Sequence, residues 1–273
     1  MLFVDLHGTA VPALGFGTYR LTGDACREGV LDALSLGYRH LDTATSYDNE
    51  AEVGEALRRS DVSRSEVFLT TKVWVTDLAA PDVQRSAEQS LRRLGTDYVD
   101  LLLVHWPSRT VPLEETLGAF ERLQQAGKTR LIGVSNFPPG LFARAMELAP
   151  VVCNQVEYHL FLDQTRIHGL CQKHEALLTA YRPLARGVVS EDPVVREIAE
   201  AHGVTPAQVA LRWLLQQPRV AAIPMASSPE HRRANLAALD FALSDAEVGR
   251  LRALTTANRR YVNPPDLAPD WEA

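Results

Sequence analysis

Cysteine is scarce in this sequence of 273 residues. The three cysteines, Cys26, Cys153 and Cys171, lie far apart, and no two of them form a C-x-x-C pair. An odd number of scattered cysteines indicates neither a disulfide framework nor a zinc site. We therefore expect no bound metal and a reducing, cytoplasmic location.

Long apolar runs are also missing. The first residues, MLFVDLHGTAVP, lack the basic start and the extended apolar stretch of an export signal. Nowhere do about 18 uncharged apolar residues follow one another, as a membrane-spanning helix would require. The sequence therefore predicts a protein that is neither exported by that route nor embedded in a membrane.

Clusters of lysine and arginine are absent as well, and the formal net charge is −6. Because phosphate backbones are bound by clustered basic residues, we expect small molecules rather than nucleic acids as partners. Hydrophobic residues make up 46% of the chain and charged residues 23%, which is typical of a globular protein. No linker-like segment interrupts it, so we expect one domain over residues 1–273.

The sequence does contain a regular alternation of short apolar runs with amphipathic segments of about 10–15 residues, the pattern of βα units. The eight runs are ALGFG, HLDTA, VFLTTKV, VDLLLVH, LIGVS, CNQVEY, LLTAY and VAAIP. Eight units in about 250 residues predict a (β/α)8 barrel, the TIM-barrel fold. A doubly wound sheet is the competing architecture, but Gly15 and Gly17 lack the third glycine of its nucleotide-binding motif.

The segments between the runs have helical periodicity. In PDVQRSAEQSLRRLG, one face carries Val83, Ala87, Leu91 and Leu94. Two stretches lie outside the repeat: VDLHGTAVPAL, which is typical of an N-terminal β-hairpin that could plug the barrel floor, and a C-terminal extension over 244–273.

Polar residues follow three consecutive predicted strands, at the barrel end where active sites lie. Asp42 ends the second strand, Tyr47 lies in the next loop, Lys72 ends the third strand and His105 the fourth. A buried carboxylate needs a partner, and Lys72 is the cation that Asp42 requires.

Each of these four residues has an ordinary structural explanation when it is taken alone. Asp42 could cap a helix, Lys72 could extend to solvent, His105 could be a packing residue and Tyr47 an exposed loop tyrosine. These explanations do not predict that all four converge on one face of the barrel, and we therefore favour a functional site.

Together the four residues could protonate a carbonyl oxygen. We expect the Lys72 ammonium to lower the pKa of Tyr47, so that the phenol becomes a proton donor near neutrality. Asp42 would hold Lys72, while His105 would orient the carbonyl oxygen. Reduction of a carbonyl by hydride requires such an assembly.

Ordered motifs add a resemblance to this interpretation. The sequence is similar to the aldo-keto reductase family from about Leu14 to Leu254, and most similar to its bacterial 2,5-diketo-D-gluconate reductase B type. The motifs that carry the resemblance are DTATSYDNE, TTKVW, LLLVHWP, IGVSNF, NQVEYH, AYRPLARG and TPAQVALRWLLQ. The resemblance implies a (β/α)8 barrel that reduces aldehydes and ketones with NADP(H), with NAD(H) possible.

The resemblance also implies site residues. The catalytic tetrad would be Asp42, Tyr47, Lys72 and His105, the four residues already selected. The cofactor would be bound, without a Rossmann fold, by Ser135, Asn136, Gln155, Tyr181, Arg182, Leu184, Ser227, His231, Arg232 and Asn235. Ser135, Asn136 and Gln155 would hold its carboxamide and Tyr181 would stack on its ring.

Three departures from the family pattern bear on these roles. Asp48 replaces the usual glycine after the catalytic tyrosine, and Arg182 replaces a small serine and could contact the cofactor pyrophosphate. Met225 and His231 stand where relatives carry lysine and arginine, beside Ser227, Ser228, Arg232 and Arg233. We therefore expect NADPH use with weak discrimination against NADH.

Aromatic residues predict the substrate pocket, with Tyr19, Trp74, Trp106 and Trp271 as its candidates. Because the loops SRTVPLEE and ARGVVSEDP are short, we expect an open site for small aldehydes, α-dicarbonyls and keto-sugars. The fold needs no partner to complete this site, so we expect a monomer.

Two other functions compete with reduction. Lys72 could form a Schiff base in a lyase, although an ion-paired ammonium is a poor nucleophile. A non-catalytic, nucleotide-binding sensor could share the fold. An intact tetrad favours the reductase.

Overall fold

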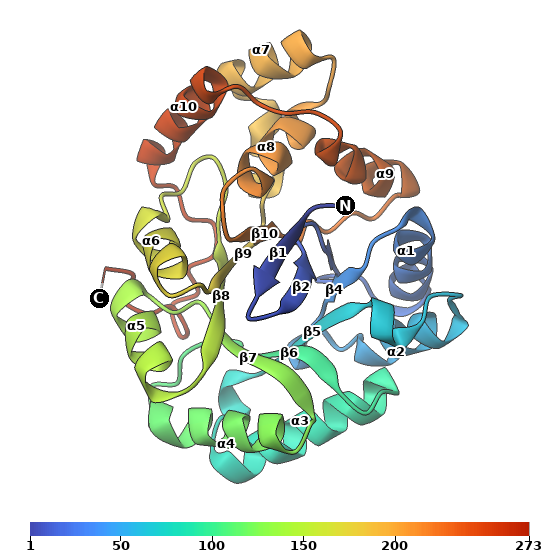
Figure 1. Cartoon of the computed structure of the whole chain (residues 1–273), viewed down its shortest axis with the longest axis vertical. Helices are drawn as coiled ribbons and strands as arrows, with labels where there is room; N and C mark the ends of the chain where they lie inside the picture. The colour runs from blue at the N-terminus through green and yellow to red at the C-terminus, as the bar shows by residue number, and fades with distance from the viewer. Residues whose placement is uncertain (273) are drawn as a thin grey trace.

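The computed structural model describes residues 1–272, with eight parallel strands at its centre (Figure 1). They follow one another around the sheet in chain order as β3 (Phe16–Gly17), β4 (His40–Asp42), β5 (Phe68–Val73), β6 (Val99–Val104), β7 (Thr129–Ser135), β8 (Val151–Glu157), β9 (Leu177–Tyr181) and β10 (Val220–Ala222). Backbone hydrogen bonds from Gly15 to Ala222 (2.9 Å) and from Gly17 to Pro224 (3.1 Å) join the two ends of the sheet. The predicted (β/α)8 barrel is confirmed.

Helices surround the strands (Figure 1). The α-helices are α1 (Gly23–Leu36), α2 (Glu50–Arg59), α3 (Ala80–Leu94), α4 (Leu113–Gln125), α5 (Pro139–Leu148), α6 (Thr165–Lys173), α7 (Pro193–His202), α8 (Pro206–Leu215), α9 (Pro229–Leu236) and α10 (Asp245–Ala253). Short 3-10 helices are η1 (Thr45–Tyr47), η2 (Arg64–Glu66), η3 (Val75–Asp77), η4 (Ala185–Ser190), η5 (Ala237–Leu239) and η6 (Leu254–Ala257). The regular alternation is broken once, because both α7 and α8 lie between β9 and β10.

Helix α3 shows how the sequence specifies these elements. Its buried face includes Val83, Ala87, Leu91 and Leu94, as the periodicity predicts. The helix ends at Gly95, whose φ of 64° is the left-handed conformation that glycine adopts without steric cost.

The predicted hairpin is present as β1 (Phe3–Leu6) and β2 (Thr9–Pro12), and it lies inside the ring of strands (Figure 1). Its turn residues, His7 and Gly8, both have positive φ, as a two-residue hairpin turn requires. Leu6 and Val11 are fully buried against a cluster of strand side chains: Phe68, Leu101, Leu103, Leu131, Val152, Cys153, Leu177 and Ala221. The hairpin therefore closes the barrel floor.

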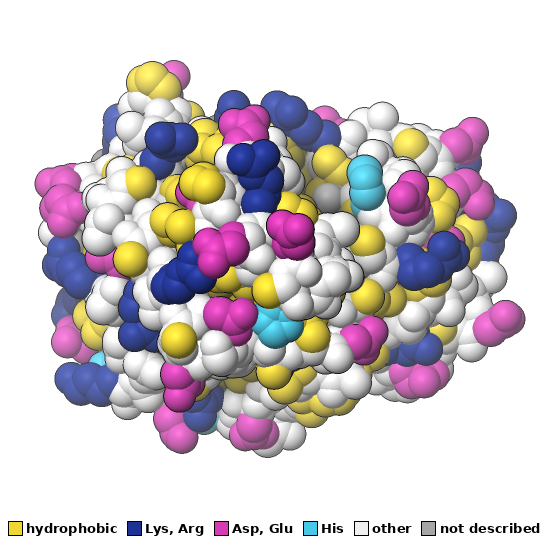
Figure 2. All heavy atoms as spheres, turned by 90° about the horizontal axis from the view of Figure 1, so that it is seen from above, with side chains coloured by type: hydrophobic (Ala, Val, Ile, Leu, Met, Phe, Trp, Pro, Cys, Tyr) yellow, Lys and Arg dark blue, Asp and Glu magenta, His cyan; other side chains and the backbone are white. Residues whose placement is uncertain are grey.

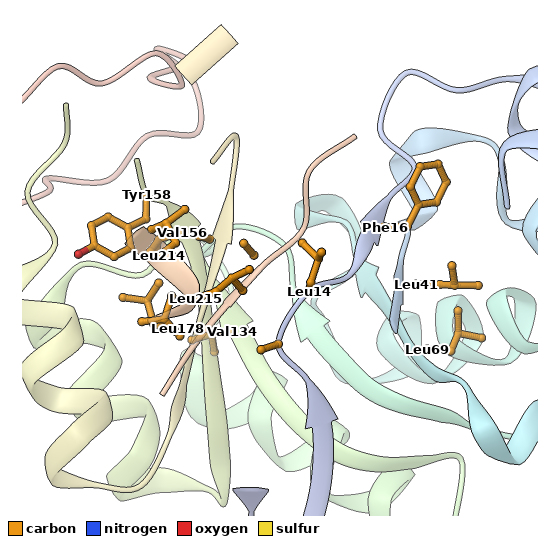
Figure 3. Packing of buried hydrophobic residues seen from close by; sticks show 14 of the residues in the cluster. Leu14, Phe16, Leu41, Leu69, Val134, Val156, Tyr158, Leu178, Leu214 and Leu215 are labelled. Carbon is orange, nitrogen blue, oxygen red and sulfur yellow. The ribbon is translucent and has the colours of Figure 1, made fainter. Parts of the chain in front are cut away.

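A second, larger cluster fills the space between the strands and the helices. Leu41 and Leu69 pair in register on β4 and β5 and lie side by side, while Leu214 of α8 packs near Val156 of β8 (Figure 3). Burial on both faces explains why β6 is apolar throughout except for Asp100.

The surface is charged and mixed. Lysine and arginine side chains alternate with aspartate and glutamate on the face turned toward the viewer in Figure 2. Within residues 1–272, no helix is both long and apolar enough to cross a bilayer.

Candidate active site

A cleft of about 1070 Å³ opens at the carboxyl ends of the strands. Asp42, Tyr47 and His105 line the cleft, and Lys72 lies fully buried beside them. The structure thus brings together the four residues that end or follow β4, β5 and β6.

Asp42 and Lys72 form a buried ion pair. Their side chains are joined by a contact of 2.6 Å between Nζ and Oδ1, at exposures of 1% for Asp42 and 0% for Lys72. Lys72 also donates to the carbonyl oxygen of Thr43 at 2.8 Å, and the amide of Gln155 donates to Asp42 Oδ2 at 2.7 Å. Burial lowers the pKa of Lys72, while the Asp42 carboxylate opposes that shift. Both charges are therefore compensated without solvent.

Tyr47 ends η1, and its hydroxyl lies 3.4 Å from Lys72 Nζ. Burial raises the pKa of Tyr47 well above its usual value, and the charge of Asp42 adds to this effect. The predicted lowering of the phenol pKa toward neutrality is therefore not seen. The main cause is the removal of the phenol from solvent, and the shortest contacts of Lys72 go to Asp42 and Thr43.

His105 directly follows β6, and its backbone N–H donates to the carbonyl oxygen of Val73 at the end of β5. Burial lowers its pKa well below the usual value, with the Lys72 charge as a second cause, so the ring is neutral near pH 7. Nδ1 lies 3.4 Å from the hydroxyl of Ser46, and if Ser46 donates this bond, Nε2 carries the ring proton. The ring packs edge-on against Trp74 and Tyr47. His105 can therefore serve as a neutral hydrogen-bond donor.

Asp48, which directly follows Tyr47, has a φ of 54°. Glycine adopts this left-handed conformation freely, whereas a side chain makes it costly. Asp48 therefore holds a conformation that favours glycine and places a mild strain beside the tetrad.

Four predicted cofactor residues form a connected network in the cleft. The Asn136 amide nitrogen donates to the His105 carbonyl oxygen and to Ser135 Oγ, and Asn136 Oδ1 accepts from the Tyr181 hydroxyl at 2.7 Å. Ser135 Oγ donates to the backbone of Gln155 at 2.7 Å. The same residues that would hold a carboxamide thus also tie β7, β8 and β9 to the tetrad.

Arginine side chains dominate the charge of the cleft. Arg20, Arg182 and Arg186 line it, and within residues 1–272 Asp42 is its only acidic lining residue. Arg182 makes no side-chain hydrogen bond to any described residue, and its charge acts to lower the pKa of Tyr47 against the effect of burial. The cleft therefore presents an electropositive wall next to the phenol.

Over residues 225–235, where the resemblance implies cofactor contacts, the structure differs from expectation at Arg232. Its side chain is only 4% exposed and donates to Asp32 of α1 at 2.5 Å and to the carbonyl oxygen of Ala226. Arg232 is therefore engaged in a buried ion pair in this structure, and its expected contact with the cofactor stays a prediction. Ser228 caps α9 by accepting from the His231 backbone, and the His231 side chain is exposed. None of Ser227, His231, Arg232 and Asn235 lines the cleft, whereas Leu184 does.

Three of the four predicted substrate aromatics line the cleft, namely Tyr19, Trp74 and Trp106. Trp271 does not line it. The centroid of its ring lies 6.2 Å from that of Trp106, and its Nε1 donates to Asn263 Oδ1, so Trp271 contacts two residues that line the cleft.

Apart from Trp271, the sequence interpretation assigned no residue of the C-terminal segment after η6 to the site. Five of its residues line the cleft: Tyr261, Val262, Asn263, Pro264 and Leu267. One signal could have located their attachment point, because Glu157 is a second acid inside an apolar strand and needs a buried partner as Asp42 does.

Comparisons with known proteins agree with this geometry. The family model "Aldo/keto reductase family" matches residues 13–256. A methylglyoxal reductase of Escherichia coli O157:H7, DkgB, is 40% identical over 268 residues, covering 96% of this chain and all of that protein. Morphine 6-dehydrogenase of Pseudomonas putida is 37% identical, covering 96% of this chain and 93% of that enzyme.

A crystal structure of a protein assigned as a 2,5-diketo-D-gluconic acid reductase B is similar with a TM-score of 0.97 and 46% identity, covering 99% of this chain and 97% of that chain. The family match covers nearly the whole barrel and the ends of its strands, where the tetrad lies. The chain therefore belongs to the aldo/keto reductase family and is an oxidoreductase.

Proposed function

We propose that the protein reduces small aldehydes, α-dicarbonyls and keto-sugars to alcohols, with NADPH as the preferred hydride donor and Tyr47 as the proton donor. The observation that carries this proposal is the chain of contacts from Asp42 to Lys72 (2.6 Å) and from Lys72 to the Tyr47 hydroxyl (3.4 Å) at the wall of the cleft. The relative DkgB is named for methylglyoxal reduction, which supports an α-dicarbonyl substrate.

The donor set of the cleft fits a nicotinamide dinucleotide, which would supply the hydride. Ser135, Asn136 and Gln155 offer amide and hydroxyl groups, and Tyr181 offers a ring face. The guanidinium of Arg182 suits a pyrophosphate, because arginine binds phosphate oxygens through two parallel hydrogen bonds.

The high pKa of Tyr47 suits a general acid that must keep its proton until it is needed. Before reaction the phenol stays neutral, and His105 donates a hydrogen bond to the carbonyl oxygen and fixes its position. As negative charge develops on that oxygen, Tyr47 transfers its proton there. The ammonium of Lys72 then stabilises the phenolate that remains, and Asp42 keeps Lys72 charged.

Cofactor discrimination should be weak. A 2′-phosphate is selected by positive charge, and Met225 provides none. Arg232 is held by Asp32, which leaves the exposed Arg233 as the cation of α9 and the exposed His231 ring as a hydrogen-bonding group near the start of the helix. We propose NADPH as the preferred donor, with measurable activity from NADH.

One experiment separates the proposed reductase from its alternatives. Purified protein is mixed with methylglyoxal and either NADPH or NADH, and cofactor oxidation is followed by absorbance. Turnover with both cofactors, faster with NADPH, supports the proposal. Borohydride trapping of a carbonyl compound on Lys72 would support a lyase instead, and tight cofactor binding without turnover would support a sensor. A preference for NADPH above about 10⁴-fold would contradict weak discrimination.

A further inference from the structure

The C-terminal segment over 258–272 forms part of the cleft without secondary structure of its own. It follows η6 and contains turns but no helix or strand. Tyr261 and Val262, near its start, line the cleft together with Pro264 and Leu267. A wall of this kind holds its position only through individual contacts with the barrel.

Glu157, the last residue of β8, makes a buried contact with this segment. The carboxylate is 0% exposed and accepts hydrogen bonds from the backbone N–H groups of Tyr261 and Val262, each at 2.8 Å. Nε2 of His159 lies 3.0 Å from the same carboxylate. Because His159 Nδ1 accepts from the Phe161 N–H, Nε2 carries the ring proton in the neutral tautomer and donates to Glu157.

These three donors hold the carboxylate in its charged form. Burial alone would raise the pKa of Glu157, but the bonds from His159, Tyr261 and Val262 outweigh burial and lower its pKa. Hydrogen bonds to an ionised acceptor are stronger than neutral ones. By contrast, the contact between Arg166 and Glu272 near the end of the segment is exposed and 3.4 Å long.

Strand β8 connects this anchor with the reaction centre. Gln155 and Glu157 are two residues apart, so their side chains project to the same side of the strand. Gln155 donates to Asp42 and thereby contacts the tetrad, while Glu157 holds the segment. Strand β8 therefore links the start of the segment directly to the tetrad, while Arg109 holds a later part of the segment through the carbonyl oxygen of Ala268 at 2.9 Å.

We propose that Glu157 is a positioning residue that sets the substrate-side wall of the cleft and so determines how large carbonyl substrates are bound. The proposal rests on the proposed reductase function. A small carbonyl compound reaches Tyr47 and His105 without the wall, whereas a larger one also needs contact with Tyr261 and Val262.

The test compares Glu157→Gln with the wild type on two α-ketoaldehydes, methylglyoxal and phenylglyoxal, which share the reacting group and differ in size. We expect KM for phenylglyoxal to rise about tenfold or more, since one bond to a charged group is lost. KM for methylglyoxal and kcat for both should stay within about threefold. Glu272→Gln is the matched control, with an exposed acid on the same segment, and should behave as the wild type.

Hydrogen exchange measured by mass spectrometry gives a second readout. Peptides over 258–272 should exchange faster in Glu157→Gln, while peptides from β5 and β6 stay protected. Equal losses with both carbonyl compounds, or unchanged exchange over 258–272, would overturn the proposal. If Glu157→Gln does not fold, Glu157→Asp keeps the charge but shortens the side chain by one methylene, which weakens its bonds to the Tyr261 and Val262 backbone, and the same outcomes apply. A wild type inactive on both compounds would refute the reductase function, while exchange would still test the anchor.

Discussion

The ion pair between Asp42 and Lys72 allows a quantitative prediction about stability and activity. We consider Asp42→Asn, Lys72→Met and the double variant. Removing one partner leaves the other charge buried and uncompensated, because both side chains are inaccessible to solvent. Breaking a buried pair in this way costs about 3–5 kcal/mol, so each single variant should lose that amount of unfolding free energy.

The double variant should lose less than the two single variants together. It buries no net charge, and the thioether side chain introduced by Lys72→Met fills much of the volume of the lysine stem. Direct partners usually show a coupling energy of about 0.5–3 kcal/mol, and a contact of 2.6 Å between full charges should lie at the upper end. Activity should not recover, because the phenolate of Tyr47 then lacks the ammonium that stabilises it.

Urea unfolding followed by tryptophan fluorescence measures these free energies, and Trp213 in α8 is a fully buried reporter. The kcat/KM for methylglyoxal gives the catalytic effect. Strictly additive losses would show that the two charges do not compensate each other. A double variant with more than about a tenth of wild-type activity would show that the ammonium is dispensable for proton transfer.

Three further predictions concern single side chains. Tyr47→Phe should lower kcat by about 10²–10⁴-fold and leave cofactor affinity unchanged in a fluorescence titration; a variant above about a tenth of wild-type turnover would contradict its role as proton donor. Asp48→Gly should stabilise the protein by about 0.5–1 kcal/mol in urea unfolding, because glycine accepts the φ of 54° without strain, and an unchanged or lower stability would refute this. His231→Arg should raise the ratio of kcat/KM for NADPH over NADH by about fivefold or more, and a constant ratio would mean that the side chain does not reach the 2′-phosphate.

Hydrophobic patterns in short stretches of the sequence predict most of the strands and helices of this fold. Alternating apolar runs located all eight strands, and the periodicity of Val83, Ala87 and Leu91 located the buried face of α3. Parallel strands place their carboxyl ends at one edge, so the sequence alone predicts that Asp42, Lys72 and His105 lie close together. These inferences succeed because hydrophobic periodicity and strand direction are properties of short segments.

The C-terminal wall could not be found in this way. Tyr261 and Glu157 are 104 residues apart, and their hydrogen bond depends on how an irregular segment returns to β8. No periodicity marks such a segment, since its path is fixed by individual contacts and not by a repeating pattern.

Tertiary structure also decided which charges are available for chemistry. The sequence predicts Arg232 as a cofactor-binding residue, yet its side chain is buried against Asp32, 200 residues away in the chain. The pKa of Tyr47 rises although a lysine lies close by, because burial outweighs the neighbouring charge. The sequence determined which ionisable groups this protein has and at which end of the barrel they lie. Only the fold decided their partners and their desolvation, because both depend on all the atoms that surround a group in space.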